Sequence, residues 1–474
     1  MPVAATERTL ALEWYRRNRE RSRTIFDLID PSAYYSRPIA LRNPIVFYEG
    51  HLPAFSVIAF LERGLGRPPV DRERQALFAR GIDPASEATA VPRSGASTQW
   101  PSRDEVLRFA RACDDAVMDA IERAPLAAEG LYTALEHEAM HQETLLYMWH
   151  RVPYAQKRGP RLPPEGGSHE YSPKDSYSSK DSWLPPSGGR ISIPAGTATL
   201  GARRPSTSSG QGPSTGSGQG PSTGSGHAGG VVFGWDNEFD EHRANVPAFE
   251  IDAHNVTNQD FLAFVEAGGY DRRDVWDDRA WAWLQQDGVR HPAFWVRRDD
   301  AWFWRGMFAE YPLPPSWPVY VSHAEATAYA RWKGRRLMTE PEFHRAAYGT
   351  PSGEEREQPW GDAPADATRA NIDFHSWEPM PVGSFPAGAS AWGVHDLVGN
   401  GWEWTSTVFA PFPGFRPMRS YPEYSAEFFD GEHYVMKGAS PATARELVRR
   451  SFRNWFRPNY PYVYATFRTV KDSK

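Results

Sequence analysis

Two histidines, His137 and His141, stand four residues apart in the stretch LEHEAMHQET at residues 135–144. The stretch contains no glycine or proline, so we expect a helix, on which residues i and i+4 lie on one face about one turn apart. Two imidazoles in this arrangement can hold a metal ion, but the same spacing also occurs between ordinary histidines. The pair therefore indicates a candidate metal site and leaves a purely structural interpretation open.

A third nitrogen ligand would make the metal interpretation stronger, and His51 is the best candidate. It lies in the predicted helix RNPIVFYEGHLPAFSVIAFLERG at residues 42–64. Pro53 removes the backbone donor that would bond to Glu49, so we expect a local kink that turns the His51 ring inward. Three neutral imidazoles suit Fe(II), Zn(II), Cu or Ni, so the ligands alone do not select the metal.

Residues 1–155 contain four segments with the apolar spacing of helices, which predicts a bundle. Asn43 is expected to be the N-cap of the second helix, with Pro44 at its first position. Ser102 and Glu105 predict a capping box on the third helix. The interior of such a bundle is a usual place for a metal held by facing helices.

The rest of the chain differs from this region in composition and in the pattern of its apolar residues. Residues 156–188 are rich in proline, glycine and serine, which predicts a linker. Residues 189–474 consist of short apolar pieces, two clear helices and long loops, and such loops often shape a site. A low-complexity insertion at 203–230 repeats the unit GQGPSTGS. Two domains are therefore expected.

Composition limits the partners. The net charge of -6, with no blocks of lysine or arginine, argues against nucleic acid or a membrane surface as the main partner. We find no apolar run near the roughly 20 residues that span a bilayer and no signal peptide, so we expect a cytoplasmic monomer that acts on small molecules. Cys113 is the single cysteine, which excludes disulfides within the chain.

Several motifs resemble a known family. GHLPAF and LEHEAMHQETLLYM resemble the amino-terminal DinB-like four-helix bundle of the non-haem iron sulfoxide synthases, which make ergothioneine and ovothiol. AYARWKGRRLMTEPEF, GNGWEWT and YSAEFFDGEHYVMKGAS are similar to their second domain, a formylglycine-generating-enzyme-type, C-type-lectin-like fold. The resemblance covers nearly the whole chain except the linker and the repeat. It implies a multidomain α and α+β protein.

The resemblance also implies a reaction, in which iron and O2 oxidatively join a sulfur or selenium donor to the imidazole of a histidine derivative. Fe(II) would be held by His51, His137 and His141. The family holds hercynine, the trimethylated histidine, with an asparagine and a tryptophan that match Asn454 and Trp455. A quaternary ammonium donates no hydrogen bond and is best held by aromatic faces.

Two further expectations follow from the resemblance. Gln142, next to the second ligand, is expected to contact the imidazole or carboxylate of hercynine. The family also uses a tyrosine of its second domain as a proton donor, and Tyr421 and Tyr424 are the candidates. Neighbouring phenylalanines show that aromatic residues in this stretch can also be purely structural.

One departure from the family concerns the donor. Ergothioneine-type enzymes that use gamma-glutamylcysteine carry an aspartate and an arginine where this chain has Phe456 and Tyr460, and only Arg457 could partly compensate. Without those charges the carboxylates of a dipeptide donor would lack partners. This favours the selenoneine branch, a selenoneine synthase that joins a selenosugar to hercynine and gives a selenoxide.

Two alternatives stay open. The nearest is an ergothioneine-type sulfoxide synthase that uses cysteine or gamma-glutamylcysteine as the thiol. A different class is a zinc DinB-like thiol transferase or a plain binding module. Formylglycine generation is disfavoured, because that chemistry needs a pair of cysteines.

Overall fold

The computed structural model describes residues 2–79, 100–126, 128–159, 189–204, 225–226 and 232–473. The predicted linker beyond residue 159 and most of the predicted insertion at 203–230 lie outside the described residues. The chain forms two compact units. Unit 1 comprises Met1–Ser168, Gly226–Phe233 and Met418–Pro422, and unit 2 comprises His169–Ser225, Gly234–Pro417 and Glu423–Lys474.

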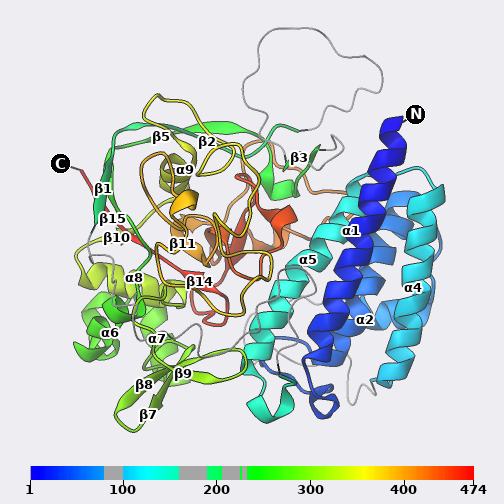
Figure 1. Cartoon of the computed structure of the whole chain (residues 1–474), viewed down its shortest axis with the longest axis horizontal. Coiled ribbons are helices and arrows are strands. Elements are labelled where there is room, and N and C mark those ends of the chain that lie inside the picture. The colour runs from blue at the N-terminus through cyan, green and yellow to red at the C-terminus, as the bar shows by residue number, and fades with distance from the viewer. Residues whose placement is uncertain are drawn as a thin grey trace. The chain divides into compact units, whose positions relative to one another are not determined.

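Unit 1 is a helical bundle. Its helical elements are α1 (Pro2–Asp27), η1 (Pro31–Ala33), α2 (Ile45–Ser56), η2 (Val57–Gly64), α3 (Arg72–Phe78), α4 (Arg103–Arg123), α5 (Ala128–Arg151) and η4 (Tyr154–Gln156). The long helices α1, α2, α4 and α5 lie side by side, with α2 packed on α4 and α1 on α5 (Figure 1). After Pro53, α2 continues directly into the π-helical segment η2, and π-helical turns are frequent at functional sites.

The helix ends test two of the predictions. The capping box is confirmed, because the Ser102 side chain accepts from the backbone N–H of Glu105 while the Glu105 carboxylate accepts from the N–H of Ser102. The prediction for Asn43 is wrong by one residue. Pro44 is the N-cap of α2, with an extended ψ of 160° and no side-chain hydrogen bond, so the helix begins at Ile45.

The continuous helix formed by α2 and η2 corrects the expectation that no apolar run approaches the length that spans a bilayer. Among the described residues, Ile45–Gly64 is long and apolar enough to cross a bilayer by length and composition. However, 89% of its apolar window is buried inside the protein. Such burial is typical of a core helix, and it explains why a helix that carries a polar histidine, His51, is so apolar overall.

Unit 2 is built on small sheets with helices beside them. One four-stranded sheet has the order β1 (Arg190–Ile193), β6 (Phe249–Asp252), β15 (Thr469–Asp472) and β10 (Arg336–Leu337). A second has the order β13 (Asn454–Phe456), β12 (Tyr434–Ala439), β11 (Gly401–Val408) and β14 (Ala465–Thr466). Smaller sheets pair β2 (Gly196–Leu200) with β5 (His242–Val246), and β7 (Trp295–Arg298) with β8 (Ala301–Arg305) and β9 (Glu310–Pro312).

The helices of unit 2 are α6 (Asn258–Glu266), α7 (Asp278–Asp287), α8 (His323–Trp332) and α9 (Glu340–Tyr348). α6 and α8 confirm the two helices that the sequence predicts in NQDFLAFVEAGG and SHAEATAYARWKG. α7 and α9 were missed, and Pro341 near the start of α9 obscured its helical pattern. The second four-stranded sheet places Trp455 opposite Val435 in antiparallel register.

Candidate metal centre

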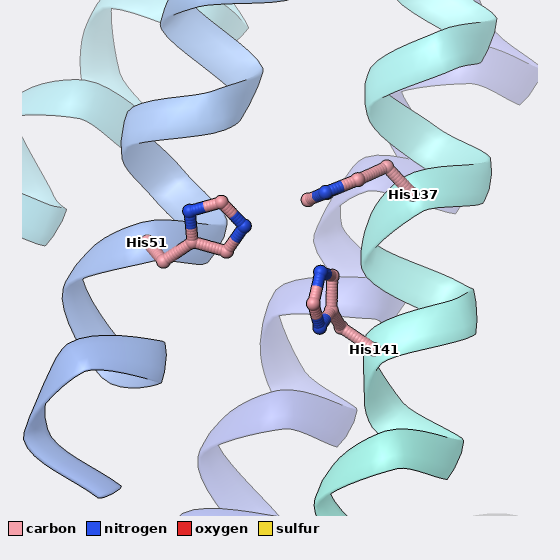
Figure 2. Close-up of side chains that lie close together, drawn as sticks. All are labelled: His51, His137 and His141. Atoms are coloured by element: carbon pink, nitrogen blue, oxygen red, sulfur yellow. The ribbon is translucent and has the colours of Figure 1, made fainter. Parts of the chain in front are cut away.

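Three imidazoles meet inside unit 1. His51 comes from α2, and His137 and His141 come from successive turns of α5 (Figure 2). One nitrogen from each ring lies within 4.8 Å of the other two, and no other such group of metal-binding side chains occurs in the described part of the chain. His51 and His137 are only 3% and 4% exposed. The structure thus brings together the three residues that the sequence selected.

The His51 ring is fixed by two neighbours. Phe47 stacks on it one turn earlier, with ring centroids 4.9 Å apart, and the His51 Nδ1 atom lies 2.8 Å from the carbonyl oxygen of Phe78. Because a carbonyl only accepts hydrogen bonds, Nδ1 carries the proton and Nε2 presents its lone pair. Metal-bound histidines are commonly oriented in this way by an acceptor behind the ring.

Phe78 reaches this position because Gly50 has no side chain. A Cβ atom at Gly50 would lie 2.6 Å from the Phe78 ring. Phe78 is also the last residue of α3, so its carbonyl is one of the groups that a helix end leaves without an intrahelical partner. His51 satisfies that carbonyl, and the carbonyl orients His51.

The other two ligands are packed by aromatic rings. Phe55 stacks on His137 with centroids 3.5 Å apart at 12°, and Tyr48 lies 5.8 Å from His141. The Nδ1 atoms of His137 and His141 are buried and make no hydrogen bond to any described residue. These orphaned nitrogens and the unused lone pair of the His51 Nε2 atom fit a metal ion as the missing partner.

The protonation states agree with a metal site. Burial lowers the pKa of His51 to about 4. Burial, followed by the neighbouring histidines, also lowers the pKa of His137, and burial with His51 and Arg42 nearby does the same for His141. All three imidazoles are therefore neutral near pH 7, which is the form that binds metal.

Residues 137–141, HEAMH, also fit the HExxH pattern of zinc metalloproteases, a match that the sequence interpretation missed. In that pattern the glutamate is the general base of the protease. Here the Glu138 carboxylate accepts from Arg19 at 2.8 Å and from Ser22 at 2.6 Å, both on α1. Glu138 is bound on the α1 side of α5, so it does not fit the role of a protease base.

The two candidate tyrosines have different surroundings. Tyr421 belongs to unit 1, where its ring lies 4.9 Å from Phe55 and 6.0 Å from His137. Tyr424 belongs to unit 2, where it stacks on Trp235 at 3.9 Å and lies 5.1 Å from Trp455. Tyr421 is thus the candidate that lies beside a proposed ligand.

Gln142 is expected to contact hercynine, but its side chain is bonded to residues of α1. Its side chain is fully buried, its Nε2 donates to the Asn18 carbonyl at 3.0 Å and to Ser22 at 3.1 Å, and its Oε1 accepts from Arg21. These bonds join α5 to α1 and favour a packing role. A contact between Gln142 and substrate stays a prediction.

In unit 2, Trp455 lies in an aromatic cluster. Its ring stacks on Phe409 at 4.1 Å and 7°, with Tyr424 and Phe428 at 5.1 and 5.6 Å. The Asn454 Oδ1 atom accepts from the Trp455 backbone N–H at 2.9 Å. Aromatic faces gathered around a half-exposed Trp455 are able to hold a quaternary ammonium group.

The residues that depart from the family pattern are also in unit 2. Phe456 and Tyr460 stack on each other with centroids 5.1 Å apart, and Tyr460 is only 5% exposed. Arg457 forms ion pairs with Asp430 at 3.2 Å and with Glu432. Its charge is thus balanced within unit 2, which weakens the idea that it replaces the missing donor-binding arginine.

Sequence reasoning missed the neighbours that orient the ligands. Phe47 and Phe55 stand four residues before and after His51, so their helical spacing was a usable signal. The Phe78 carbonyl carried no signal, because a backbone acceptor 27 residues away leaves no trace in residue type.

Comparison with known proteins first defines the class. Residues 182–473 match the sulfatase-modifying factor enzyme 1-like domain, and the residues before them form the helical bundle with its histidine triad. The chain is 33% identical over 441 residues to hercynine oxygenase of Mycolicibacterium thermoresistibile, covering 91% of this chain and 88% of that protein. It therefore belongs to the hercynine oxygenase family of oxidative enzymes, the sulfoxide synthases.

Two further relatives agree. The chain is 40% identical to hercynine oxygenase of Mycobacterium tuberculosis over 50% of this chain and 56% of that protein. It is 26% identical to ergothioneine biosynthesis protein 1 of Neurospora crassa over 92% of this chain and 54% of that protein. The predicted family and the predicted fold class, a helical region followed by a formylglycine-generating-enzyme-type domain, are confirmed. The DinB-like identity of the bundle stays a prediction.

The relatives also bear on the donor. Their names support the ergothioneine-type alternative better than the selenoneine interpretation that the sequence favoured. Phe456 and Tyr460 had carried that preference, but two substituted positions do not identify a donor.

Proposed function

We propose that this protein is an Fe(II)- and O2-dependent enzyme that forms a carbon–sulfur bond on the imidazole ring of hercynine. The observation that carries the proposal is the buried triad of His51, His137 and His141, whose nitrogens lie within 4.8 Å of one another. The names of the relatives supply the substrate. With a thiol donor, one imidazole C–H, one S–H and O2 give a C–S(=O)–C sulfoxide and water, which balances all atoms and the four electrons.

Different residues of unit 1 would have different roles in this reaction. The three histidines would hold Fe(II), which when bound would supply O2 activation and leave coordination positions open for substrates. Tyr421 would supply a proton from its hydroxyl during oxygen reduction, since its ring lies beside His137. Phe47, Phe55 and Tyr48 would keep water away from the triad.

Hercynine would be held by groups that suit its charges. The aromatic cluster of Trp455, Phe409, Tyr424 and Phe428 would hold the trimethylammonium group by cation–π attraction. The Asn454 amide, which is half-exposed, would bond the carboxylate or the imidazole.

A selenosugar is a second candidate donor. The observation in its favour is the uncharged Phe456–Tyr460 stack, together with an Arg457 that is already paired with Asp430 and Glu432. A zwitterionic dipeptide would find no free charge among these residues, whereas a neutral, hydroxyl-rich donor needs none.

The test is anaerobic reconstitution with Fe(II), followed by hercynine, O2 and one donor at a time: cysteine, gamma-glutamylcysteine or a selenosugar. Mass spectrometry identifies the product and an oxygen electrode measures O2 uptake. A sulfoxide of hercynine supports the proposal, and turnover with the selenosugar alone would transfer it to the second donor. Tight zinc binding with no O2 uptake for any donor would refute the oxidative function and favour a zinc thiol transferase.

A further inference from the structure

Ser420 directly precedes Tyr421, and every polar group that it has is bound by the helices of unit 1. Its N–H and its hydroxyl donate to the Glu129 Oε1 atom at 2.8 and 2.9 Å. Its carbonyl accepts from Arg63 at 3.0 Å. The Thr133 Oγ1 atom lies 2.8 Å from the Ser420 Oγ atom, and since the Ser420 proton points to Glu129, Thr133 is the donor.

The partners of Ser420 stand on the same helix faces as the metal ligands. On α5, Glu129, Thr133 and His137 follow one another at intervals of four residues. On α2 and η2, His51, Phe55 and Arg63 belong to a similar series with Ala59 between the last two. Residues four apart on a helix are neighbours, so each series runs from the triad to the site that holds Ser420.

The π-helical form of η2 supports this alignment. In an α-helix each step of four residues turns the side chain by about 40° beyond a full turn, so a long series drifts around the helix. The i→i+5 turns of η2 wind more slowly and oppose that drift. α5 also approaches η2 closely, because a Cβ atom at Gly130 would lie 2.5 Å from the Ala59 carbonyl oxygen.

We propose that Ser420 is a positioning residue that fixes Tyr421 beside His137. Ser420 is 3% exposed, and its four hydrogen bonds come from two helices, so they fix both the place and the direction of the chain where Tyr421 begins. The Tyr421 ring then meets Phe55 and His137. The catalytic consequence of this inference rests on the proposed function of Tyr421. The binding of Ser420 by α5 and η2, called docking below, does not depend on that function.

The docking is tested on the metal-free protein by hydrogen–deuterium exchange followed by mass spectrometry. Ser420→Ala and Thr133→Val each remove one hydroxyl, and we expect the peptide that spans residues 418–422 to exchange at least about fivefold faster in both. Thr133→Ser retains the hydroxyl and should restore slow exchange. Thr24→Val is the matched control, because the Thr24 hydroxyl bonds only the Glu20 carbonyl of its own helix.

The catalytic consequence is tested on the iron-loaded enzyme by a double-mutant cycle. Thr133→Val should lower kcat about tenfold with unchanged iron affinity, and it should lower kcat no further when combined with Tyr421→Phe. Unchanged exchange in both docking variants would refute the positioning role, and so would additive losses of kcat in the double mutant. If Tyr421→Phe itself leaves kcat unchanged, the proposed function of Tyr421 fails, and the exchange rates alone then decide whether Ser420 holds the segment.

Discussion

The histidine triad of unit 1 and two buried ion pairs of unit 2 differ in how their polar groups are satisfied. In unit 1 the three imidazoles of the triad are neutral and lack charged partners within hydrogen-bonding reach among the described residues, and two of them have a nitrogen with no hydrogen bond. In unit 2, two buried arginines are each paired with a buried glutamate. Arg468 and Glu403, both fully buried, are joined through two nitrogens of the guanidinium, and Arg449 is joined to Glu238 in the same way.

This difference separates a binding site from a scaffold. A neutral nitrogen with an unused lone pair can accept a divalent cation without first losing a partner. A saturated ion pair offers no such group, and its removal leaves an uncompensated charge in the interior. The three imidazoles of the triad are therefore available for chemistry, whereas the saturated ion pairs of unit 2 stabilise its fold.

The largest expected effect comes from the triad. His137→Ala removes one of three ligands, and we expect metal affinity to fall by more than about 100-fold, beyond the loss typical of a neighbour that only orients a ligand. Anaerobic titration with Fe(II) or Co(II) measures the affinity. His150→Ala on the same helix should retain the metal, because His150 is not part of the triad. Unaltered binding by His137→Ala would remove the site assignment.

The next effect concerns stability. Glu403→Gln leaves the buried Arg468 without its counter-charge, and we expect the free energy of unfolding to fall by about 3–5 kcal/mol. Thermal or denaturant unfolding measures the change, and the metal affinity of the triad should be unaltered. The control Glu310→Gln breaks an exposed pair with Arg298 and should cost at most about 1 kcal/mol. Equal costs in the two variants would contradict the scaffold role of the buried pair.

The aromatic cluster of unit 2 gives a smaller effect. Trp455→Ala should retain iron and raise the Kd for hercynine about 10- to 30-fold, since a desolvated cation–π contact contributes about 2 kcal/mol. Isothermal titration measures both affinities. Trp281→Ala, a half-buried tryptophan of α7 beneath Arg273, is the control and should bind hercynine normally. Normal hercynine binding by Trp455→Ala would show that the cluster is only core.

The smallest effect tests how His51 is oriented. In Gly50→Ala the new methyl group must displace the Phe78 ring, which moves the carbonyl that holds His51, and we expect metal affinity to fall about tenfold. Competition titration with a chelator resolves this change. Gly159→Ala is the control, because nothing lies within 4 Å of its added Cβ atom. If both variants bind metal equally well, the carbonyl does not tune the site.

The parts of the site that could be read from the sequence are those with a local repeat. His137 and His141 share a face because the helix places every fourth residue there, and the capping box at Ser102 depends on three residues of separation. The aromatic cluster could not be found by spacing, since Trp235, Phe409, Tyr424 and Trp455 come from four separate segments. Of these residues, the resemblance to a family indicated only Tyr424 and Trp455.

The sequence by itself determined the helices of the bundle, the three histidines and the family, because helical periodicity and contiguous motifs are local properties of the chain. Only the tertiary structure decided what stands behind and beside those histidines. It showed the Phe78 carbonyl behind His51, Glu138 and Gln142 turned toward α1, and Ser420 held by α5 and η2. The reason is physical: a hydrogen bond between residues far apart in the chain depends on where folding brings two groups, and residue type and spacing do not record that position.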